Sequence, residues 1–590
     1  MDNIFPNVTR SLSGQRWRVK AGDGRQAEAM SQRLGVPDII GRLLTTRGVD
    51  LDTAPLFLNP TLKDLLPDPL HLIDMPAAVE RLTHAVVHSE CIAVFGDYDV
   101  DGATSSALLI RFLCAVGCDP QLYIPDRLAE GYGPNTPALL KLKEQGADVV
   151  VTVDCGTSAF APFEAAHEAG LDVIVIDHHE ATETLPKAVA LVNPKRVDDP
   201  SPHTTLAAVG VTFLLVVALN RALRQRGWYT PDRPEPDLRQ WLDLVALGTV
   251  CDVVPLIGLN RAFVTTGLKV MARRSNPGLA ALLDIAQVKE SPSAFHLGYM
   301  LGPRVNAGGR VGRADLGARL LVCDDPMEAG VLALRLHELN GERREIEAAV
   351  LREALERVEA RPDTPTSLVM VAGSSWHPGV IGIVASRLKE RYGLPTCVVA
   401  IDDAGMAKGS GRSVTGIDLG QAILAAREAG ILEVGGGHAM AVGFSLPADQ
   451  LPRLEAFLAD HLATQMAGTD NTPTLEVDGV LNIAAVTPDL LQVLEQAGPF
   501  GAGNETPHFI VPNTRVSRAD VVGQGHVRLT LSGPSGQRLK AIAFRSVDTD
   551  LGAALLTTHG NTLHVMGTLK LDTWQGREEC QMIIRDAAYA

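Results

Sequence analysis

The feature that most constrains this chain is a series of short, β-rich apolar segments between residues 91 and 192. Helical patterns, such as those at 105–116 and 136–145, separate most of the segments, which are 92–95, 122–124, 149–153, 173–176 and 189–192. Strand and helix alternating in this way predict an α/β domain whose parallel sheet carries helices on both faces. A sheet of this kind places its ligands at the carboxyl ends of the strands.

Three of these predicted strands run directly into acidic residues. They lead into the sequence GDYDVDG, which contains Asp97, Asp99 and Asp101, into Asp154, and into the tripeptide Asp177-His178-His179. A further acid, Asp252, follows the helical pattern at 238–247. A single aspartate at a strand end is as well explained as a cap for the next helix. That interpretation fails for the set, because carboxylates this close repel one another unless cations lie between them.

Carboxylates and histidine at one sheet edge indicate a divalent metal centre. Carboxylate oxygens bind hard divalent ions, and imidazole suits Mn²⁺ or other transition metals. In a two-metal phosphodiesterase, one ion lowers the pKa of the attacking water and the other stabilises the leaving oxygen. The pattern therefore predicts a two-metal site for Mn²⁺ or Mg²⁺ that serves phosphodiester hydrolysis.

Composition restricts the class of protein. The net charge of −16 argues against a broad basic surface, but a narrow cleft can still be lined by arginines and metal ions. The eight cysteines form no CxxC pair, which predicts reduced thiols in a cytoplasmic protein and no cysteine zinc site. No secretory signal is expected, and the apolar run 206–219 is too short to span a bilayer and predicts a buried helix.

The chain divides into five expected parts. They are an N-terminal helical segment (1–80), a catalytic α/β domain (81–325), a connecting helix (326–365), a second α/β domain that binds substrate (366–465) and a β-barrel (474–590). A linker is expected at 468–473, and glycine-rich turns between short strands predict the barrel.

An ordered set of motifs across residues 90–445 identifies a family. After GDYDVDG come VDCG, DHH, ALGTVCDVVPL, LGPRVNAGGR, WHPGVIG, KGSGRS and GGGHA. The tripeptide Asp177-His178-His179 is the one that names the DHH phosphoesterases, and the whole order resembles the RecJ branch of that superfamily. The resemblance implies a DHH domain, a DHH-associated domain and an oligonucleotide-binding (OB) barrel.

This resemblance also implies an activity. The expected function is metal-dependent 5′→3′ hydrolysis of single-stranded DNA to 5′-mononucleotides, in recombination and repair. One alternative is a DHH phosphodiesterase or pyrophosphatase for short substrates, although such chains typically lack the barrel. The other is a scaffold without catalysis, whose mark would be missing carboxylates. Single-stranded DNA is the expected partner, with a helicase and a single-strand-binding protein implied by the resemblance, and a monomer is expected.

Residue roles follow from the same resemblance. The implied metal ligands are Asp97, Asp99, Asp101, Asp154, His178 and Asp252. His179 would orient a ligand or contact the scissile phosphate, with a buried structural histidine as the alternative, and Asp177 would hold the strand end. The implied substrate-binding residues are Arg127, Arg304, Asn306, Arg310, His377, Lys408, Ser410, Gly411, Arg412, Gly436, Gly437 and His438.

Three of the substrate-binding residues, Arg127, Ser410 and Arg412, would hold the 5′ phosphate. Taken alone, Arg127 would more simply form a surface salt bridge, and the glycines at 379–382 a tight turn before a helix. In the barrel, a basic groove and stacking aromatics would grip the strand. Candidates are Arg528, Lys540, Phe544, Arg545 and Trp574, with a role in the barrel core as the alternative for the aromatics.

Overall fold

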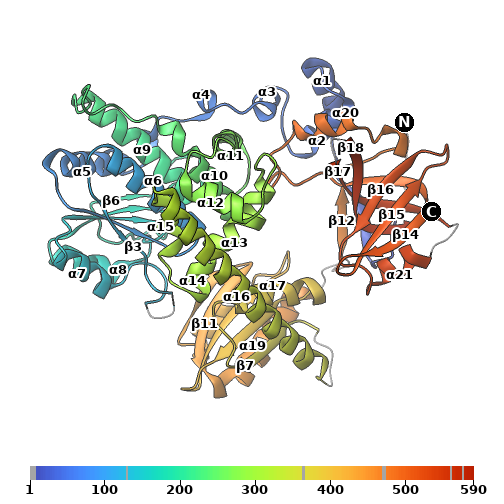
Figure 1. The fold of residues 1–590 in the computed structure, drawn as a ribbon. Helices are drawn as coiled ribbons and strands as arrows, with labels where there is room; N and C mark the ends of the chain where they lie inside the picture. Colours follow the sequence, from blue (N-terminus) through green and yellow to red (C-terminus); the bar gives the residue numbers. More distant parts are fainter. Residues whose placement is uncertain (1–7, 128–129, 362–365, 468–472, 558–560, 575–576) are drawn as a thin grey trace.

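The structure is a computed structural model that describes residues 8–127, 130–361, 366–467, 473–557, 561–574 and 577–590. Two α/β units and a β-barrel make up the molecule, with the long helix α16 beginning in the first unit and ending on the second (Figure 1). The predicted linker at 468–473 falls outside the described residues except for Pro473.

The first unit is built on a five-stranded parallel sheet with strand order β3-β2-β4-β5-β6. Its strands are β2 (Ile92–Gly96), β3 (Gln121–Tyr123), β4 (Val149–Val153), β5 (Asp172–Ile176) and β6 (Ala190–Val192). The chain leaves β2 for the edge strand β3 and then returns to the other side of β2 as β4. This reversal puts the topological switch point between β2 and β4, where open α/β sheets bind ligands.

Helices cover both faces of this sheet, as the alternating pattern predicts. Alternate residues of β2 point to opposite faces: Val94 packs with α5 (Met75–His88), α6 (Val100–Ala115) and α9 (Ala208–Gln225), whereas Phe95 packs with α7 (Thr136–Glu144) and α8 (Phe160–Glu168). The remaining helices of the unit are α10 (Leu242–Cys251), α11 (Gly258–Met271), α12 (Pro277–Ile285), the π-helical turn η3 (His296–Leu301), α13 (Gly302–Val305), α14 (Ala307–Val311) and α15 (Leu316–Val322).

Helix α9 contains most of the apolar run 206–219. Its length and apolar composition would allow it to cross a membrane, but 72% of it is buried inside the protein. It packs on α5 and α6 and contributes Phe213 and Leu219 to the main hydrophobic core. The prediction of a buried core helix is therefore confirmed.

Helix α16 (Pro326–Glu359) joins the two α/β units. Asp325 caps it by accepting a hydrogen bond from the N–H of Met327, and proline at the first helical position needs no N–H partner. The second unit has a mixed sheet of order β10-β11-β9-β8-β7. Its elements are β7 (Val369–Ser374), α17 (Ile381–Tyr392), β8 (Thr396–Ile401), β9 (Met406–Arg412), α18 (Leu419–Glu428), β10 (Val434–His438), β11 (Ala441–Pro447) and α19 (Leu451–Met466).

The C-terminal unit is a closed barrel. Its sheet runs β13-β14-β15-β16-β18-β17, and a further pairing of β14 with β17 closes it. The elements are β13 (Gly479–Val480), α20 (Pro488–Glu495), β14 (Phe509–Val522), β15 (His526–Ser532), β16 (Arg538–Ala543), α21 (Asp550–Thr557), β17 (Thr562–Trp574) and β18 (Arg577–Tyr589).

The first part of the N-terminal segment packs on the barrel, whereas its last part, including Leu62, Leu65 and Leu66, packs on the first α/β unit. Strand β1 (Arg16–Val19) pairs in parallel with β12 (Thr474–Val477), and Met30 and Ile40 share a core with Leu494 and Phe509. The helices expected in this segment are present as α1 (Gly24–Leu34), α2 (Asp38–Thr46), α3 (Ala54–Leu58) and α4 (Leu62–Leu65). The strand was not expected, because its partner lies more than 450 residues away in the sequence.

One buried hydrogen bond fixes this junction and can be tested. The indole Nε1–H of Trp17 donates to Oδ2 of Asp586 at 2.8 Å, and Asp586 is 0% exposed. Trp17→Phe leaves that carboxylate oxygen without its donor, so the barrel should lose about 1–3 kcal/mol of unfolding free energy. Calorimetry on Trp228→Phe, which removes an indole bond to Val116 in the catalytic unit, provides the control. An unchanged barrel transition in Trp17→Phe would show that this hydrogen bond does not stabilise the junction.

Candidate metal centre and anion pocket

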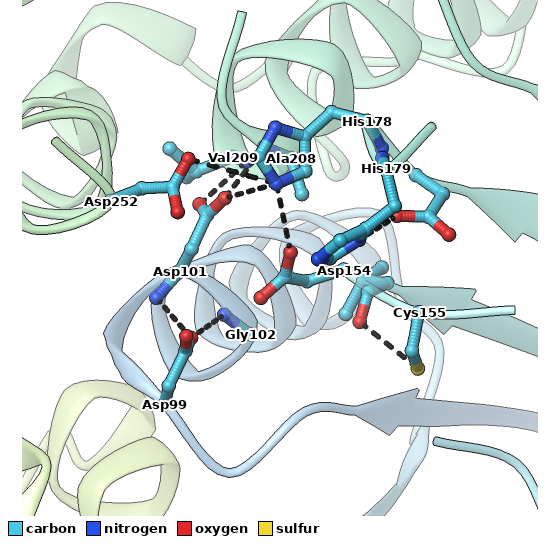
Figure 2. Close-up of polar contacts among 12 residues, drawn as sticks. Asp99, Asp101, Gly102, Asp154, Cys155, His178, His179, Ala208, Val209 and Asp252 are labelled. Carbon is cyan, nitrogen blue, oxygen red and sulfur yellow. Dashed lines mark hydrogen bonds and ion pairs between the residues drawn. The ribbon is translucent and has the colours of Figure 1, made fainter. Parts of the chain in front are cut away.

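All six predicted metal ligands converge at the carboxyl edge of the first sheet. Asp97 follows β2, Asp154 follows β4, and His178 follows β5, while Asp99 and Asp101 begin α6 and Asp252 follows α10. Figure 2 shows five of these side chains, those of Asp99, Asp101, Asp154, His178 and Asp252, around one space. Nε2 of His178 lies 3.3 Å from Asp154, 3.6 Å from Asp252 and 3.7 Å from Asp101.

Close backbone approaches make this convergence possible. Gly102 starts α6 so near β2 that a Cβ atom there would lie 2.4 Å from the backbone oxygen of Asp97. At Gly248 in α10, a Cβ would meet Thr104 Oγ1 at 2.3 Å. Asp154 itself has a φ of 63°, a left-handed conformation that costs energy outside glycine and occurs at functional sites.

Backbone N–H groups orient two of the carboxylates. Asp101 accepts bonds from the N–H groups of Ala208 (2.6 Å) and Val209 (2.9 Å) at the start of α9, where the helix dipole favours negative charge. Asp99 caps α6 by accepting from the N–H groups of Asp101 and Gly102. Both side chains are therefore held in place before any ion binds.

The arrangement fits divalent cations. Oδ1 of Asp97 and Oδ1 of Asp154 are buried and have no hydrogen-bond partner within the described part of the chain. Nδ1 of His178 lies 3.1 Å from the carbonyl oxygen of Leu206, to which it can only donate. In the neutral imidazole, which burial favours by lowering the pKa of His178, Nε2 then presents a lone pair to the carboxylates. Acceptors that face acceptors without a donor favour binding of a divalent cation, or of protons when no metal is present.

Burial and mutual repulsion perturb the carboxyl groups strongly. Burial, and then the charge of Asp252, raises the pKa of Asp101 to about 7, and burial, and then the charge of Asp99, raises that of Asp252 to about 7. Burial followed by neighbouring aspartates also raises the pKa values of Asp97 and Asp154 well above their ordinary range. The distances between ligand atoms define three overlapping groups that could each hold an ion: Asp97, Asp99 and Asp154; Asp101, His178 and Asp252; and Asp154, His178 and His179.

The histidine pair divides its roles. Asp177 accepts from the N–H groups of Thr157 and His178 and lies 2.7 Å from Nδ1 of His179. Burial lowers the pKa of His179, but the Asp177 carboxylate outweighs it and raises this pKa to about 9. His179 is partly exposed, which does not fit the alternative of a buried structural histidine.

A second cluster, of opposite charge, lies beside the first. The guanidinium of Arg127 sits 5.1 Å from the ring centroid of Tyr98, which lies between Asp97 and Asp99 in the sequence. Burial and the charge of Arg127 lower the pKa of Arg412, and they lower that of Arg310 to about 10. Arg127, Arg310 and Arg412 therefore form an arginine cluster, which an anion would stabilise.

The second α/β unit contributes residues next to this arginine cluster. Nη1 of Arg412 donates to Oγ of Ser410 at 3.2 Å, and a Cβ at Gly382, in the first turn of α17, would lie 3.0 Å from both side chains. Arg310 donates to the carbonyl of Gly379 at 3.1 Å and so joins the two units. His377 accepts from the N–H of Gly379, and burial followed by Arg127 lowers its pKa.

The other predicted substrate-binding residues separate into groups. Lys408, Ser410 and Arg412 share one face of β9, and the register places Gly436 and His438 of β10 in the same rows. Gly411 lies on the opposite face, where a Cβ would meet Val442 at 2.6 Å, and Gly437 alternates in the same way. Arg304 is 7% exposed and bonds to Met300 and His337, so it is engaged within the protein.

Comparison with known proteins identifies the same three domains. The DHH family, N-terminal domain, matches residues 91–249, the DHHA1 domain matches 365–464, and the RecJ OB domain matches 477–586. The single-stranded-DNA-specific exonuclease RecJ of Bacillus subtilis is 35% identical over 98% of this chain and 71% of its own length. The protein of that name from Escherichia coli is 37% identical over 93% of this chain and 95% of its own.

The chain belongs to the RecJ family. Among solved structures, RecJ of Thermus thermophilus in complex with Mn²⁺ superposes with a TM-score of 0.81 at 30% identity, over 98% of this chain and 80% of that chain. The same protein in complex with Mg²⁺ gives a TM-score of 0.76 at 29% identity, over 98% and 78%. The predicted fold class, a parallel-sheet DHH domain and a DHH-associated α/β domain joined by a long helix, with a C-terminal OB barrel, is confirmed.

Several residues next to the site were not identified from the sequence. Tyr98 links the two charged clusters, and the Tyr132 hydroxyl donates to the carbonyl of Asp154 at 3.3 Å. The charge of Lys195 acts on both His178 and Asp252. Tyr98 could have been found, since it lies inside GDYDVDG, whereas Lys195 carries no local signal.

The raised carboxyl pKa values predict a pH dependence for metal-free protein. Between the ordinary aspartate pKa of 3.8 and about 7, folded Asp101 and Asp252 bind protons that the unfolded chain has released. Stability must then fall as pH rises through this window. In EDTA, Tm should be lower at pH 8 than at pH 5, and excess Mn²⁺ at pH 8 should restore it. Asp252→Asn should flatten the profile in EDTA. A wild-type Tm in EDTA that is independent of pH would contradict the cluster's electrostatics.

Proposed function

We propose that this chain is a metal-dependent exonuclease that hydrolyses single-stranded DNA in the 5′→3′ direction and releases 5′-mononucleotides, in DNA recombination and repair. The observation that carries the proposal is the juxtaposition of a carboxylate cluster with an arginine cluster, linked through Tyr98. One cluster suits divalent cations and the other suits a phosphate. Its membership of a family of single-stranded-DNA-specific exonucleases supports the same substrate.

Mn²⁺ or Mg²⁺ would be held by the six ligands Asp97, Asp99, Asp101, Asp154, His178 and Asp252. When bound, two such ions activate water and neutralise charge on the phosphate. Asp154 and His178 each belong to two of the three ligand groups, so they lie at the centre of the ligand set. Since Nδ1 of His178 donates to Leu206, only its Nε2 is free to hold an ion. His179, kept protonated near neutral pH by Asp177, would donate a proton or a hydrogen bond to the scissile phosphate.

The arginine cluster would set the polarity of degradation. A terminal phosphate carries more charge than an internal one, so Arg127 and Arg412 would favour it through charge-assisted hydrogen bonds. Ser410 and the N–H groups at the start of α17 would add neutral donors. A phosphate fixed there would lie one nucleotide from the bond that is cut.

An arginine-lined cleft offers a path for the rest of the strand. The cleft has a volume of about 740 Å³ and is lined by Tyr299, Asn306, Glu347 and the arginines 310, 343, 344, 387 and 545. Arg545 comes from the barrel, so the cleft leads from Arg310 toward that unit. Tyr299 is 70% exposed and stacks on Phe295, and the barrel's Phe544 is 53% exposed. Exposed aromatics of this kind stack on bases.

Other candidates from the barrel contribute less. Lys540 pairs with Glu579 and Arg528 with Asp520, so their charges are partly compensated, and the side chain of Trp574 lies outside the described residues. A phosphodiesterase for short substrates would have no use for Arg545 in the cleft, so this alternative is not favoured. A helicase and a single-strand-binding protein are proposed as partners from the resemblance, a cytoplasmic location is proposed from the cysteine pattern, and a monomeric state is proposed as well.

The direct test uses purified protein, Mn²⁺ and labelled DNA. With a 5′-labelled single strand, the label should appear as a mononucleotide from the first time point, while a blunt duplex remains intact. Asp154→Ala should abolish this activity and retain its circular dichroism spectrum. Release of a 3′ label first, or wild-type rates in folded Asp154→Ala, would reject the proposal.

The arginine cluster makes a separate prediction about the 5′ end. Arg412→Ala should lower kcat/KM by about 10- to 100-fold on 5′-phosphorylated strands, as expected for one lost charge-assisted bond. On 5′-hydroxyl strands the loss should be much smaller. The control is Arg391→Ala, which removes an exposed arginine of α17 that pairs with Glu359 of α16. If Arg412→Ala keeps the wild-type preference for phosphate, the pocket lies elsewhere.

A further inference from the structure

A buried arginine joins the barrel to the catalytic unit. Arg261, in α11, is 1% exposed, and its guanidinium lies 4.0 Å from the ring centroid of Phe57. It donates to the carbonyl oxygens of Phe57, Ala497, Gly498 and Pro499. Among the described residues, all of its hydrogen bonds go to backbone carbonyls. A charge buried in this way is costly unless its donors are satisfied. The joint therefore depends on α11, the segment at Phe57 and the loop at 497–499 all being in place.

The loop that Arg261 holds is itself organised. Residues 497–504 follow α20, and the side-chain amide of Asn504 donates to the carbonyls of Ala497 (2.9 Å) and Pro499 (2.8 Å). The loop also receives a bond from the catalytic unit, because the N–H of Leu256 donates to the carbonyl of Ala502 at 2.7 Å. Figure 1 shows α11 on the side of the catalytic unit that faces the barrel.

This joint continues into the metal centre through two backbone segments. The first runs from Asp252 to Leu256 and includes Val253, whose φ of 60° is strained for a β-branched residue. The second, residues 205–209, orients two other ligands: the carbonyl of Leu206 accepts from His178, and the N–H groups of Ala208 and Val209 bind Asp101.

Asn260, next to Arg261, ties these two segments together. Its amide donates to the carbonyl of Thr205 at 2.7 Å and to the carbonyl of Pro255 at 3.1 Å. It is 1% exposed, and it starts the same helix that carries Arg261. A shift of this end of α11 would therefore move the supports of Asp101, His178 and Asp252 together.

We infer that Arg261 and Asn260 are positioning residues through which the docked barrel sets the geometry of the metal centre. Barrel docking and metal binding would then stabilise each other, since any such coupling is reciprocal. The barrel would be more than a grip for long strands, because its position would also affect catalysis on strands too short to reach it. The inference rests on the proposed function only for the choice of substrate.

The test measures Mn²⁺ affinity of the full-length protein by calorimetry, together with hydrolysis of a strand of about four nucleotides, near the lower limit that an OB fold spans. Arg261→Met and Asn260→Ala should each weaken Mn²⁺ binding by about tenfold or more, as loss of ligand-orienting partners does. Both should lower kcat on the short strand. Arg261→Lys, which keeps the charge but has fewer donors, should fall between Arg261→Met and wild type.

The matched control is Arg233→Met. Arg233 also stacks on an aromatic ring, 3.6 Å from the Trp228 centroid, and donates to a backbone carbonyl, but it lies outside the joint. It should retain wild-type Mn²⁺ affinity. If Arg261→Met does not fold, Arg261→Lys and Asn260→Ala decide the outcome.

The opposite result is well defined. Wild-type Mn²⁺ affinity and kcat on the short strand in the folded joint variants, with only KM for long strands raised, would overturn the coupling and leave the joint a passive tether. Wild-type protein that binds Mn²⁺ but hydrolyses no DNA would instead reject the proposed function. The two failures are therefore distinguishable.

Discussion

Repulsion among buried carboxylates is the constraint on which the rest of this structure depends. Asp97, Asp101 and Asp154 are each no more than 3% exposed, and Nε2 of His178 faces acceptors on three sides. A fully packed sheet and its covering helices hold these groups together against that repulsion. Since cations bind the folded arrangement and relieve the repulsion, metal binding adds to the stability of the fold.

Positive charge is concentrated in two places near the metal centre. A chain with a net charge of −16 offers little attraction to DNA at long range, so the positive charge must act locally. It does so in the cluster of Arg127, Arg310 and Arg412 and in the cleft that leads to Arg545 of the barrel. Cations would neutralise one cluster and phosphates the other, which makes the two sites complementary parts of one substrate path.

Much of this architecture could be predicted from sequence because it follows local periodicity. Strand–helix alternation predicted the sheet, and aspartates at strand ends predicted the carboxylate cluster, since parallel strands finish at one edge. The pairing of β1 with β12 and the joint at Arg261 could not be predicted, because their partners lie more than 200 residues away and leave no local pattern. The face that Gly411 occupies could not be read from the glycine-rich motif, since it follows from alternation along β9.

The central claim is that this carboxylate edge binds two divalent ions, and anomalous X-ray diffraction from crystals soaked in Mn²⁺ measures it most directly. The account predicts two anomalous peaks at this edge, one of them within coordination distance of Nε2 of His178 and at least one within coordination distance of Asp154. Peaks should disappear or weaken at this edge in Asp154→Asn crystals. No peak at this edge, or a single peak that contacts neither Asp154 nor His178, would contradict the account.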